Sequence, residues 1–290
     1  MPKEHDLLEG IPDAVVVSDR DGKIVYANMQ AESLTGYGHA ELIGRKVEIL
    51  VPAGLRVAHV QHRRRFYARG VARLMGGLDD DFQLRRKDGS AVPVEISLGP
   101  VGDDTVAVIR DFSERRRMEL ALEHRALHDP LTDIGNRTLF FDRLRQSLLN
   151  ARRERGQVAI VMLDVDGFKA VNDAYGHATG DGVLKQLADR LKRGRATDTA
   201  ARLGGDEFAW ILPRVSGRAG VQRMVRRRLN LVQQPVVVEK QSIPIHISAG
   251  IAIYPDDGRD VDRLIRRADS AMYTAKRDSR AAALNLSGDR

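Results

Sequence analysis

The chain has 290 residues, which is long enough for two domains, and its 42% hydrophobic and 30% charged residues are typical of a globular protein. It contains no Cys, which excludes disulfides, thiolate metal sites, Cys catalysis and the thiol that a blue-light flavin adduct requires. No apolar run is long enough to span a bilayer, and the first six residues are polar rather than a signal peptide. We therefore expect a cytoplasmic protein with no membrane partner.

The formal net charge is +7, yet the basic residues do not indicate a nucleic-acid partner. Only 5% of the residues are aromatic, and the arginine runs lie far apart, at residues 63–65, 115–117 and 226–228. We interpret these runs as solvated helix faces. A basic chain also suits a small, highly anionic substrate.

The first unit, residues 7–112, has the pattern of an antiparallel sheet with short helices between its strands. Two strands at residues 14–18 and 23–27 are separated by a turn and form a hairpin. Short helices at residues 31–37 and 40–45 are expected to end near glycine. A meander of three strands closes the unit, at residues 82–86, 92–98 and 105–112.

Several motifs of this unit resemble those of PAS sensor domains, which implies a PAS fold for residues 1–112. They are Asp19-x-x-Gly22-x-Ile24-x-Tyr26-x-Asn28, Leu34-Thr35-Gly36-Tyr37, Leu42-Ile43-Gly44, Arg86-Lys87-Asp88-Gly89 and Asp111-Phe112-Ser113-Glu114-Arg115. His59 stands where haem-binding PAS domains carry their axial ligand, which makes haem an alternative cofactor. Asp79, however, stands roughly where those sensors have a distal arginine, and a carboxylate cannot donate a hydrogen bond to bound oxygen. We favour a solvated or hydrogen-bonded helix residue at His59.

Residues 113–128 are dense in charge and contain neither Gly nor Pro, which predicts a helix capped by Asp111 or Ser113. A narrow apolar seam for a partner helix is offered by Met118 with Leu122, or by Leu120 with Leu127. A helix of this length is only about 24 Å long and is marginal alone in water. We therefore interpret it as a signalling linker and expect any homodimer to rest on the first unit or its flanks.

The second unit opens with a turn at residues 128–137 and an amphipathic helix at 139–150. A His-Asp pair such as His128 and Asp129 also occurs in metal phosphohydrolases, but no further histidine stands at ligand spacing, so we discount such a site. A buried strand at residues 158–163 then leads into Asp164. A carboxylate at a strand end, followed by glycine, is a frequent site for hard cations and phosphates. The alternative to a cation or phosphate site is that an acid here caps the N-terminus of the next helix. That role suits Asp166 but does not explain Asp164.

Residues 199–212 predict a β-hairpin with a primed two-residue turn formed by Gly204 and Gly205. Asp206 and Glu207 follow the turn. Because side chains alternate along a strand, at least one of these acids approaches whatever packs above the sheet. A second acid there would repel it by about 4 kcal/mol at about 4 Å and an effective dielectric of about 20, unless a cation lay between them.

Residues 171–181 are predicted to form a polar loop between glycines, followed by a helix at 182–192. Asn172 and Asp181 together offer an amide and a carboxylate that can bind the Watson–Crick edge of guanine, although an aspartate such as Asp181, taken alone, is more often a helix cap. After a strand at 243–253, a helix at 261–277 leads to Lys276 and Arg280, four residues apart on one face. The alternative is a basic tail whose side chains snorkel to solvent.

Together these elements strongly resemble the GGDEF family of diguanylate cyclases, which join two GTP molecules into cyclic di-GMP. The match spans Asp129 to about Arg280. It rests on the Asp-Pro-Leu-Thr-x-x-x-Asn-Arg opening, the Asp164-to-Lys169 turn, Asn172-Asp173 with Gly176-His177-x-x-Gly180-Asp181, the Gly-Gly-Asp-Glu-Phe hairpin and Ala268-Asp269-x-Ala271-Met272-Tyr273-x-Ala275-Lys276. The resemblance implies a mixed α/β domain of the α+β type at residues 129–290, with a palm-like sheet flanked by helices. It also implies a homodimer, because each domain binds one GTP and two domains must meet.

The resemblance assigns the site residues as well. Asp164, the Val165 carbonyl and Asp206 are expected to bind Mg²⁺ or Mn²⁺, with Glu207 completing the acidic catalytic cluster. GTP binding is assigned to Gly167, Phe168, Lys169, Asn172, His177, Asp181, Gly205, Lys276 and Arg280.

Arg195 and Asp198 match the family's Arg-x-x-Asp inhibitory site, in which the arginine binds phosphate and guanine of the product and the aspartate binds the guanine edge. This motif predicts feedback inhibition by cyclic di-GMP. Two alternatives stay open. In the first, the GGDEF domain has lost catalysis and binds GTP or product as a regulator. In the second, the chain is a piece of a longer protein that carries a phosphodiesterase domain.

Overall fold

The computed structural model describes residues 4–69, 71–76 and 82–287, and the side chains of residues 7–66, 71–76 and 82–278. The chain divides into two compact units, Met1–Ala121 and Leu122–Arg290. Both units are mixed α+β structures whose sheets are antiparallel, as expected.

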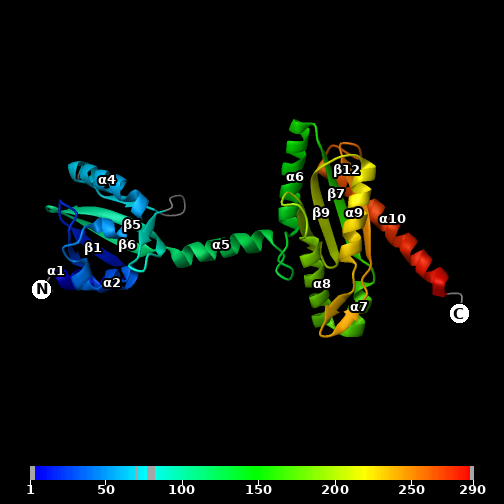
Figure 1. Ribbon diagram of the computed structural model, residues 1–290, viewed down its shortest axis with the longest axis horizontal. Coiled ribbons are helices and arrows are strands. Elements are labelled where there is room, and N and C mark those ends of the chain that lie inside the picture. Colours follow the sequence, from blue (N-terminus) through cyan, green and yellow to red (C-terminus); the bar gives the residue numbers. More distant parts are fainter. Residues whose placement is uncertain (1–3, 70, 77–81, 288–290) are drawn as a thin grey trace. The chain divides into compact units, whose positions relative to one another are not determined.

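The first unit is built on one antiparallel sheet (Figure 1). Its strands run in the order β2-β1-β6-β5-β3, and β4 also pairs with β5. Their bounds are β1 Ala14–Ser18, β2 Ile24–Ala27, β3 Arg73–Met75, β4 Gln83–Arg85, β5 Ala91–Val101 and β6 Asp104–Asp111. The predicted hairpin and the predicted terminal meander are both confirmed.

Helices α2 Met29–Thr35 and α3 His39–Leu42 and the 3₁₀ turn η1 Val47–Leu50 contribute to a core that includes the fully buried Ile24 and Leu42. The unit also contains α1 Glu4–Glu9, the 3₁₀ turn η2 Ala53–Leu55 and α4 Arg56–Arg69. Asn28 caps α2 by accepting a hydrogen bond from the Ala31 N–H at 2.9 Å. The sequence did not predict α4, because its arginine-rich residues show no apolar stripe at helical spacing.

The predicted linker helix is confirmed as α5, Ser113–Leu127. The Asp111 carboxylate accepts a hydrogen bond from the Ser113 N–H at 2.7 Å just before the helix begins. Met118 and Leu122 are exposed. At the other end of α5, the Asn136 side chain donates to the Ala126 carbonyl at 2.8 Å, so the opening turn of the second unit holds the last turn of the helix.

The second unit is organised on a four-stranded antiparallel sheet in the order β12-β7-β9-β8 (Figure 1). The strands are β7 Gln157–Val165, β8 Thr199–Gly204, β9 Glu207–Val215 and β12 Ile247–Tyr254, and a small hairpin is formed by β10 Val236–Val238 and β11 Gln241–Ile243. The helices are α6 Arg137–Glu154, α7 Phe168–Tyr175, α8 His177–Leu191, α9 Arg218–Val232 and α10 Val261–Ser287.

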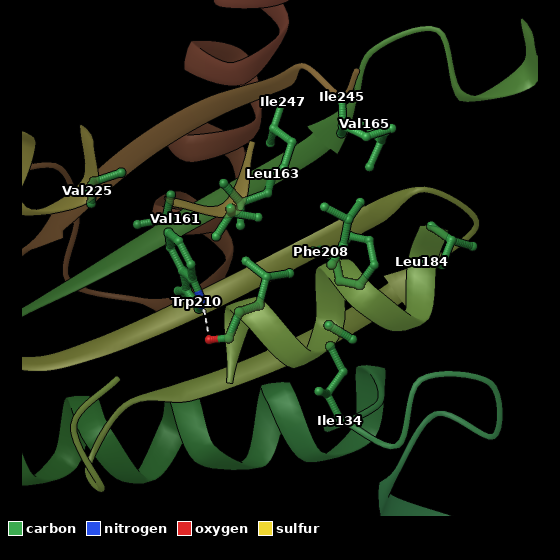
Figure 2. Packing of buried hydrophobic residues seen from close by; sticks show 14 of the residues in the cluster. Ile134, Val161, Leu163, Val165, Leu184, Phe208, Trp210, Val225, Ile245 and Ile247 are labelled. Atoms are coloured by element: carbon green, nitrogen blue, oxygen red, sulfur yellow. Dashed lines mark hydrogen bonds between the residues drawn. The ribbon is translucent and has the colours of Figure 1, made fainter. Parts of the chain in front are cut away.

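Alternation along the strands separates two cores, one on each face of the sheet. Val161 and Trp210 belong to the face that packs against α8 and α9 (Figure 2). Ile160 and Met162 belong to the face that packs against α6 and α10. Asp164 follows Met162 by two residues, so its side chain also lies on the α6/α10 face.

Two predictions about local structure in this unit are wrong. The turn of the hairpin is formed by Gly205 and Asp206 rather than by the two glycines, because the β8–β9 ladder shifts between Arg202 and Gly204. Residues 171–181 are not a loop: they belong to α7 and α8, which only Gly176 separates, with φ 82°.

The two helices pack closely at Gly180. A Cβ atom there would lie 1.9 Å from Oδ1 of Asn172, so the Asn172 side chain would have to move to admit a larger residue. The predicted strand at 243–253 is also divided, since β11 ends at Ile243 and β12 begins at Ile247.

One arginine of the run 226–228 contradicts the expected solvated face. Arg226 and Arg227 are exposed, but Arg228 is only 16% exposed and forms an ion pair with Asp198. Across the described stretches of the chain, helices with the length and apolar character needed to traverse a bilayer are absent.

Candidate active site

Three carboxylates gather where β7 ends and the β8–β9 hairpin turns. Asp164 on β7 lies directly opposite Glu207 on β9 in the strand ladder, and Asp164 is buried. Asp206 is in the turn, where its backbone oxygen accepts a hydrogen bond from the Val165 N–H at 3.2 Å. The structure therefore brings the predicted acids and Val165 together. Their catalytic role stays a prediction.

Burial and the neighbouring acids raise the cost of ionising Glu207. Burial raises the pKa of Glu207 above its ordinary value, and the charges of Asp164, Asp206 and Asp269 raise it further, while Arg137 opposes the rise. Among the described residues no group of three or more His, Cys, Asp or Glu side chains is arranged to hold a metal ion. The predicted donor set is smaller, two carboxylates and a carbonyl, and hard oxygen donors with excess negative charge fit Mg²⁺.

Lys276 supplies a cation to this cluster from a distant part of the chain. Its Nζ forms an ion pair with Oδ1 of Asp164, and both side chains are mostly buried. Lys276 lies one helical turn after Met272 on α10. A Cβ atom at Gly250 of β12 would lie 2.0 Å from the Ala268 oxygen and 2.2 Å from the Met272 nitrogen, so Gly250 lets α10 approach the sheet closely enough. The side chain of Arg280 lies outside those that the structure describes.

Arg202 anchors the hairpin turn, and the sequence analysis did not identify it. Its Nε donates to the Gly205 carbonyl at 2.9 Å, and its Nη1 lies 3.0 Å from Oδ1 of Asp129 in the opening turn of the unit. Asp129 also accepts hydrogen bonds from the Thr132 backbone and hydroxyl. Burial by itself raises the pKa of Asp129, but the hydrogen bonds from Thr132 and Arg202 outweigh it and lower that pKa. The arginine directly before Leu203 and the two glycines was the available signal.

The first turn of α7 follows the acids directly. Gly167 is the N-cap residue, with φ 68°, and no side chain caps the helix. Asp166 is not that cap: the Ser248 hydroxyl donates to both its carboxylate oxygens, at 2.9 and 3.0 Å. Phe168 is half-buried and Lys169 is exposed. The uncapped backbone N–H groups at this helix start and the exposed Lys169 are therefore available as donors for an anion.

The two residues assigned to guanine lie near each other across the α7–α8 contact. Asn172 packs against Gly180, and Asp181 is the next residue and is exposed. His177 is the first residue of α8 and is also exposed. These positions are accessible to a nucleotide, and their assignment stays a prediction.

The Arg-x-x-Asp loop lies at the other end of β8. Arg195 and Asp198 form an ion pair at 2.9 Å just before β8 begins, whereas the acidic cluster follows its end. Six strand residues span about 20 Å. Ala196, Thr197 and Asp198 also line a cavity of about 600 Å³ beside α6. The loop is therefore separate from the acids.

His59 in the first unit has a protein partner. Its Nδ1 lies 3.0 Å from Oε1 of the buried Glu48, which also receives a hydrogen bond from Arg63 at 3.2 Å. This contact matches the hydrogen-bonded helix residue that we favoured. Asp79 lies outside the described residues.

Comparisons with known proteins agree with both units. Residues 12–114 match the PAS domain family, and residues 126–282 match the family described as "Diguanylate cyclase, GGDEF domain". The chain is 44% identical over 156 residues to the bifunctional diguanylate cyclase/cyclic di-GMP phosphodiesterase MucR of Pseudomonas aeruginosa, covering 53% of this chain and 23% of MucR. It is 30% identical over 281 residues to the diguanylate cyclase DgcM of Escherichia coli, covering 94% of this chain and 66% of DgcM. The chain thus spans less than two thirds of these relatives.

A solved structure extends the likeness to three dimensions. The coiled coil and GGDEF domain of DgcB from Caulobacter crescentus, in complex with c-di-GMP, superposes with a TM-score of 0.51 at 31% identity. The match covers 57% of this chain and 89% of that structure. With an acidic hairpin at the sheet end, a matching fold and a family match over more than half its length, this chain belongs to the GGDEF family of diguanylate cyclases and carries a PAS domain before the GGDEF domain.

Proposed function

We propose that this chain is a sensor-regulated diguanylate cyclase, which condenses two GTP molecules into cyclic di-GMP and releases two pyrophosphates. The observation that carries this proposal is the pairing of Asp164 and Glu207 across the sheet, beside Asp206 and under the Lys276 ammonium. Such a group of acids with one cation suits a nucleotide triphosphate and its metal ion.

In the proposed reaction, the 3′-hydroxyl of one GTP attacks the α-phosphorus of the other in line with the departing pyrophosphate. Asp164, the Val165 carbonyl and Asp206 would hold Mg²⁺ or Mn²⁺, which when bound activates the attacking oxygen and neutralises the leaving group. Glu207 completes the negative charge around that position. Lys276 exchanges its contact with Asp164 for the triphosphate.

The remaining assigned residues position the nucleotide. The backbone N–H groups of Gly167 and Phe168, at the start of α7, donate to phosphate oxygens, and Lys169 adds a nearby positive charge. Asn172 and Asp181 bind the guanine edge. The assignment also includes contacts from His177, Gly205 and Arg280.

The organisation of the chain follows from the stoichiometry of the reaction. One GGDEF domain, residues 129–290, binds one GTP, so two copies must face each other in a homodimer. The PAS domain, residues 1–112, would sense the signal, and the helix at 113–128 would pass it on. Cyclic di-GMP is bound in the DgcB structure, and we assign its inhibitory site here to Arg195 and Asp198.

The proposal is tested by incubating the purified protein with GTP and Mg²⁺ and following cyclic di-GMP by chromatography. Bound cyclic di-GMP is first removed from the sample. We expect product from the wild type and none from Asp206→Ala, while Asp173→Ala, an exposed residue of α7, serves as the matched control and stays active. Binding of GTP or cyclic di-GMP without any turnover by the wild type would instead favour a regulator that has lost catalysis.

A further inference from the structure

A third residue, Arg228 of α9, contacts the Arg-x-x-Asp loop. It lies 30 residues after Asp198 in the chain. Nη2 of Arg228 on α9 forms an ion pair with Oδ2 of Asp198. Oδ1 of Asp198 lies 3.1 Å from Nε and 2.9 Å from Nη2 of Arg195, and Oδ2 lies 3.1 Å from the Arg195 backbone nitrogen. The Asp198 side chain is only 6% exposed.

These contacts fill the carboxylate of Asp198. An ionised carboxylate has about four positions for hydrogen-bond donors. Two donors from the Arg195 side chain occupy Oδ1, and the Arg195 backbone and Arg228 occupy Oδ2. The guanine edge brings two N–H donors of its own. It therefore reaches Asp198 only by displacing donors that belong to the chain.

Arg228 is more deeply buried in this position than Arg195, whose Nη2 also donates to the Pro213 carbonyl at 3.0 Å. The Arg228 guanidinium lies over the Trp210 ring, 5.7 Å from the centroid, and Trp210 is itself fixed by a hydrogen bond from Nε1 to the Leu191 carbonyl at 3.2 Å (Figure 2). Arg195 is 44% exposed and Arg228 16%. A Cβ atom at Gly194 would lie 3.0 Å from Oδ2 of Asp198 and 3.1 Å from Nη2 of Arg228, so glycine leaves room for the pair.

When Arg195 turns outward to a ligand, it therefore frees Oδ1 but leaves Arg228 on Oδ2. We propose that Arg228 competes with cyclic di-GMP for Asp198 and so weakens product inhibition in this chain. The inference rests on the proposed function of the Arg195 and Asp198 loop. Arg228 is thus a positioning residue, which sets the affinity of the inhibitory site through its hold on the aspartate.

The test compares the dissociation constant of cyclic di-GMP, measured by calorimetry on nucleotide-free full-length protein, between wild type and Arg228→Met. Methionine keeps apolar packing on Trp210 but removes the guanidinium. We expect the dissociation constant to fall about tenfold, the effect of one hydrogen bond to a charged group. Arg228→Lys, which keeps a cation with fewer fixed donors, should lie between the two. Arg226→Met, on the same helix and exposed, is the matched control and should bind as the wild type does.

Each outcome decides the inference. If Arg228 had a merely structural role, its removal would not raise the affinity for cyclic di-GMP. Unchanged or weaker binding of cyclic di-GMP by a folded Arg228→Met therefore overturns the competition. Weaker binding would make Arg228 a ligand of the product. Folding is checked by the fluorescence of Trp210. Cyclic di-GMP synthesis without binding by any variant overturns this inference and leaves the cyclase intact. If Arg228→Met binds cyclic di-GMP more tightly but the protein makes no cyclic di-GMP, the proposed cyclase activity is overturned and the competition stands. If the protein shows no binding of cyclic di-GMP and no synthesis, both proposals are overturned.

Discussion

Replacement of Gly250 by Ala should separate α10 from the sheet and remove Lys276 from the acidic cluster. The added Cβ would lie 2.0 Å from the Ala268 oxygen, and real Cβ atoms essentially never show contacts under 3.0 Å, so the helix must retreat by about 1 Å. The clash is with backbone atoms, which no rotamer change relieves. We expect the second unit to lose about 3 kcal/mol of stability.

The same displacement should affect catalysis. A misplacement of about 1 Å can cost about 100-fold in rate, so we expect kcat/KM for GTP to fall by about that factor. Gly220→Ala is the control: it lies on α9, nothing would contact its Cβ within 4 Å, and Ala stabilises a helix by about 0.5–1 kcal/mol relative to Gly.

Stability is measured by urea titration followed through Trp210, the sole tryptophan, which lies in the core of the second unit and reports on that unit alone. A Gly250→Ala variant that is as stable and as active as the wild type would refute the close approach of α10. Loss of activity in Gly220→Ala of the same size would also refute it, because the effect would then not depend on that contact.

Asp129→Asn should destabilise the second unit by about 3 kcal/mol near neutral pH, since it breaks a mostly buried ion pair. Although burial opposes the shift, hydrogen bonds hold the folded pKa of Asp129 below the ordinary 3.8. The stability that Asp129 contributes is therefore present above that pH and lost as the pH falls through the folded pKa. Urea titrations of the wild type and Asp129→Asn should converge in acid, and a gap that stays constant with pH would contradict this reasoning. Removal of divalent metal with EDTA should abolish GTP turnover, and Mg²⁺ should raise the Tm of the wild type but not of Asp164→Asn; an equal shift in both argues against Asp164 as a ligand. Glu48→Gln should lower the stability of the first unit by about 2 kcal/mol, followed by circular dichroism. Haemin added to the protein should give no Soret absorbance that depends on His59, and such a band would establish His59 as a haem ligand.

Local pattern was enough to locate most elements of the chain. The strand at residues 14–18, the linker helix and the buried strand that ends in Asp164 are all encoded by the spacing of apolar residues over short windows. The errors arose where the local pattern carried no helix signal. The segment at residues 171–181 is helical although its polar residues and glycines are typical of a loop, and α4 has no apolar stripe to reveal it.

The sequence by itself determined which acids stand at the ends of which strands, and its motifs determined the family. Only the tertiary structure decided what faces those acids. Lys276 reaches Asp164 across 112 positions of the chain because Gly250 admits α10, and Arg228 reaches Asp198 because α9 lies over Trp210. The period of a strand or helix fixes the face on which a side chain lies, but the partner on that face depends on how separate segments pack, and no local window contains that information.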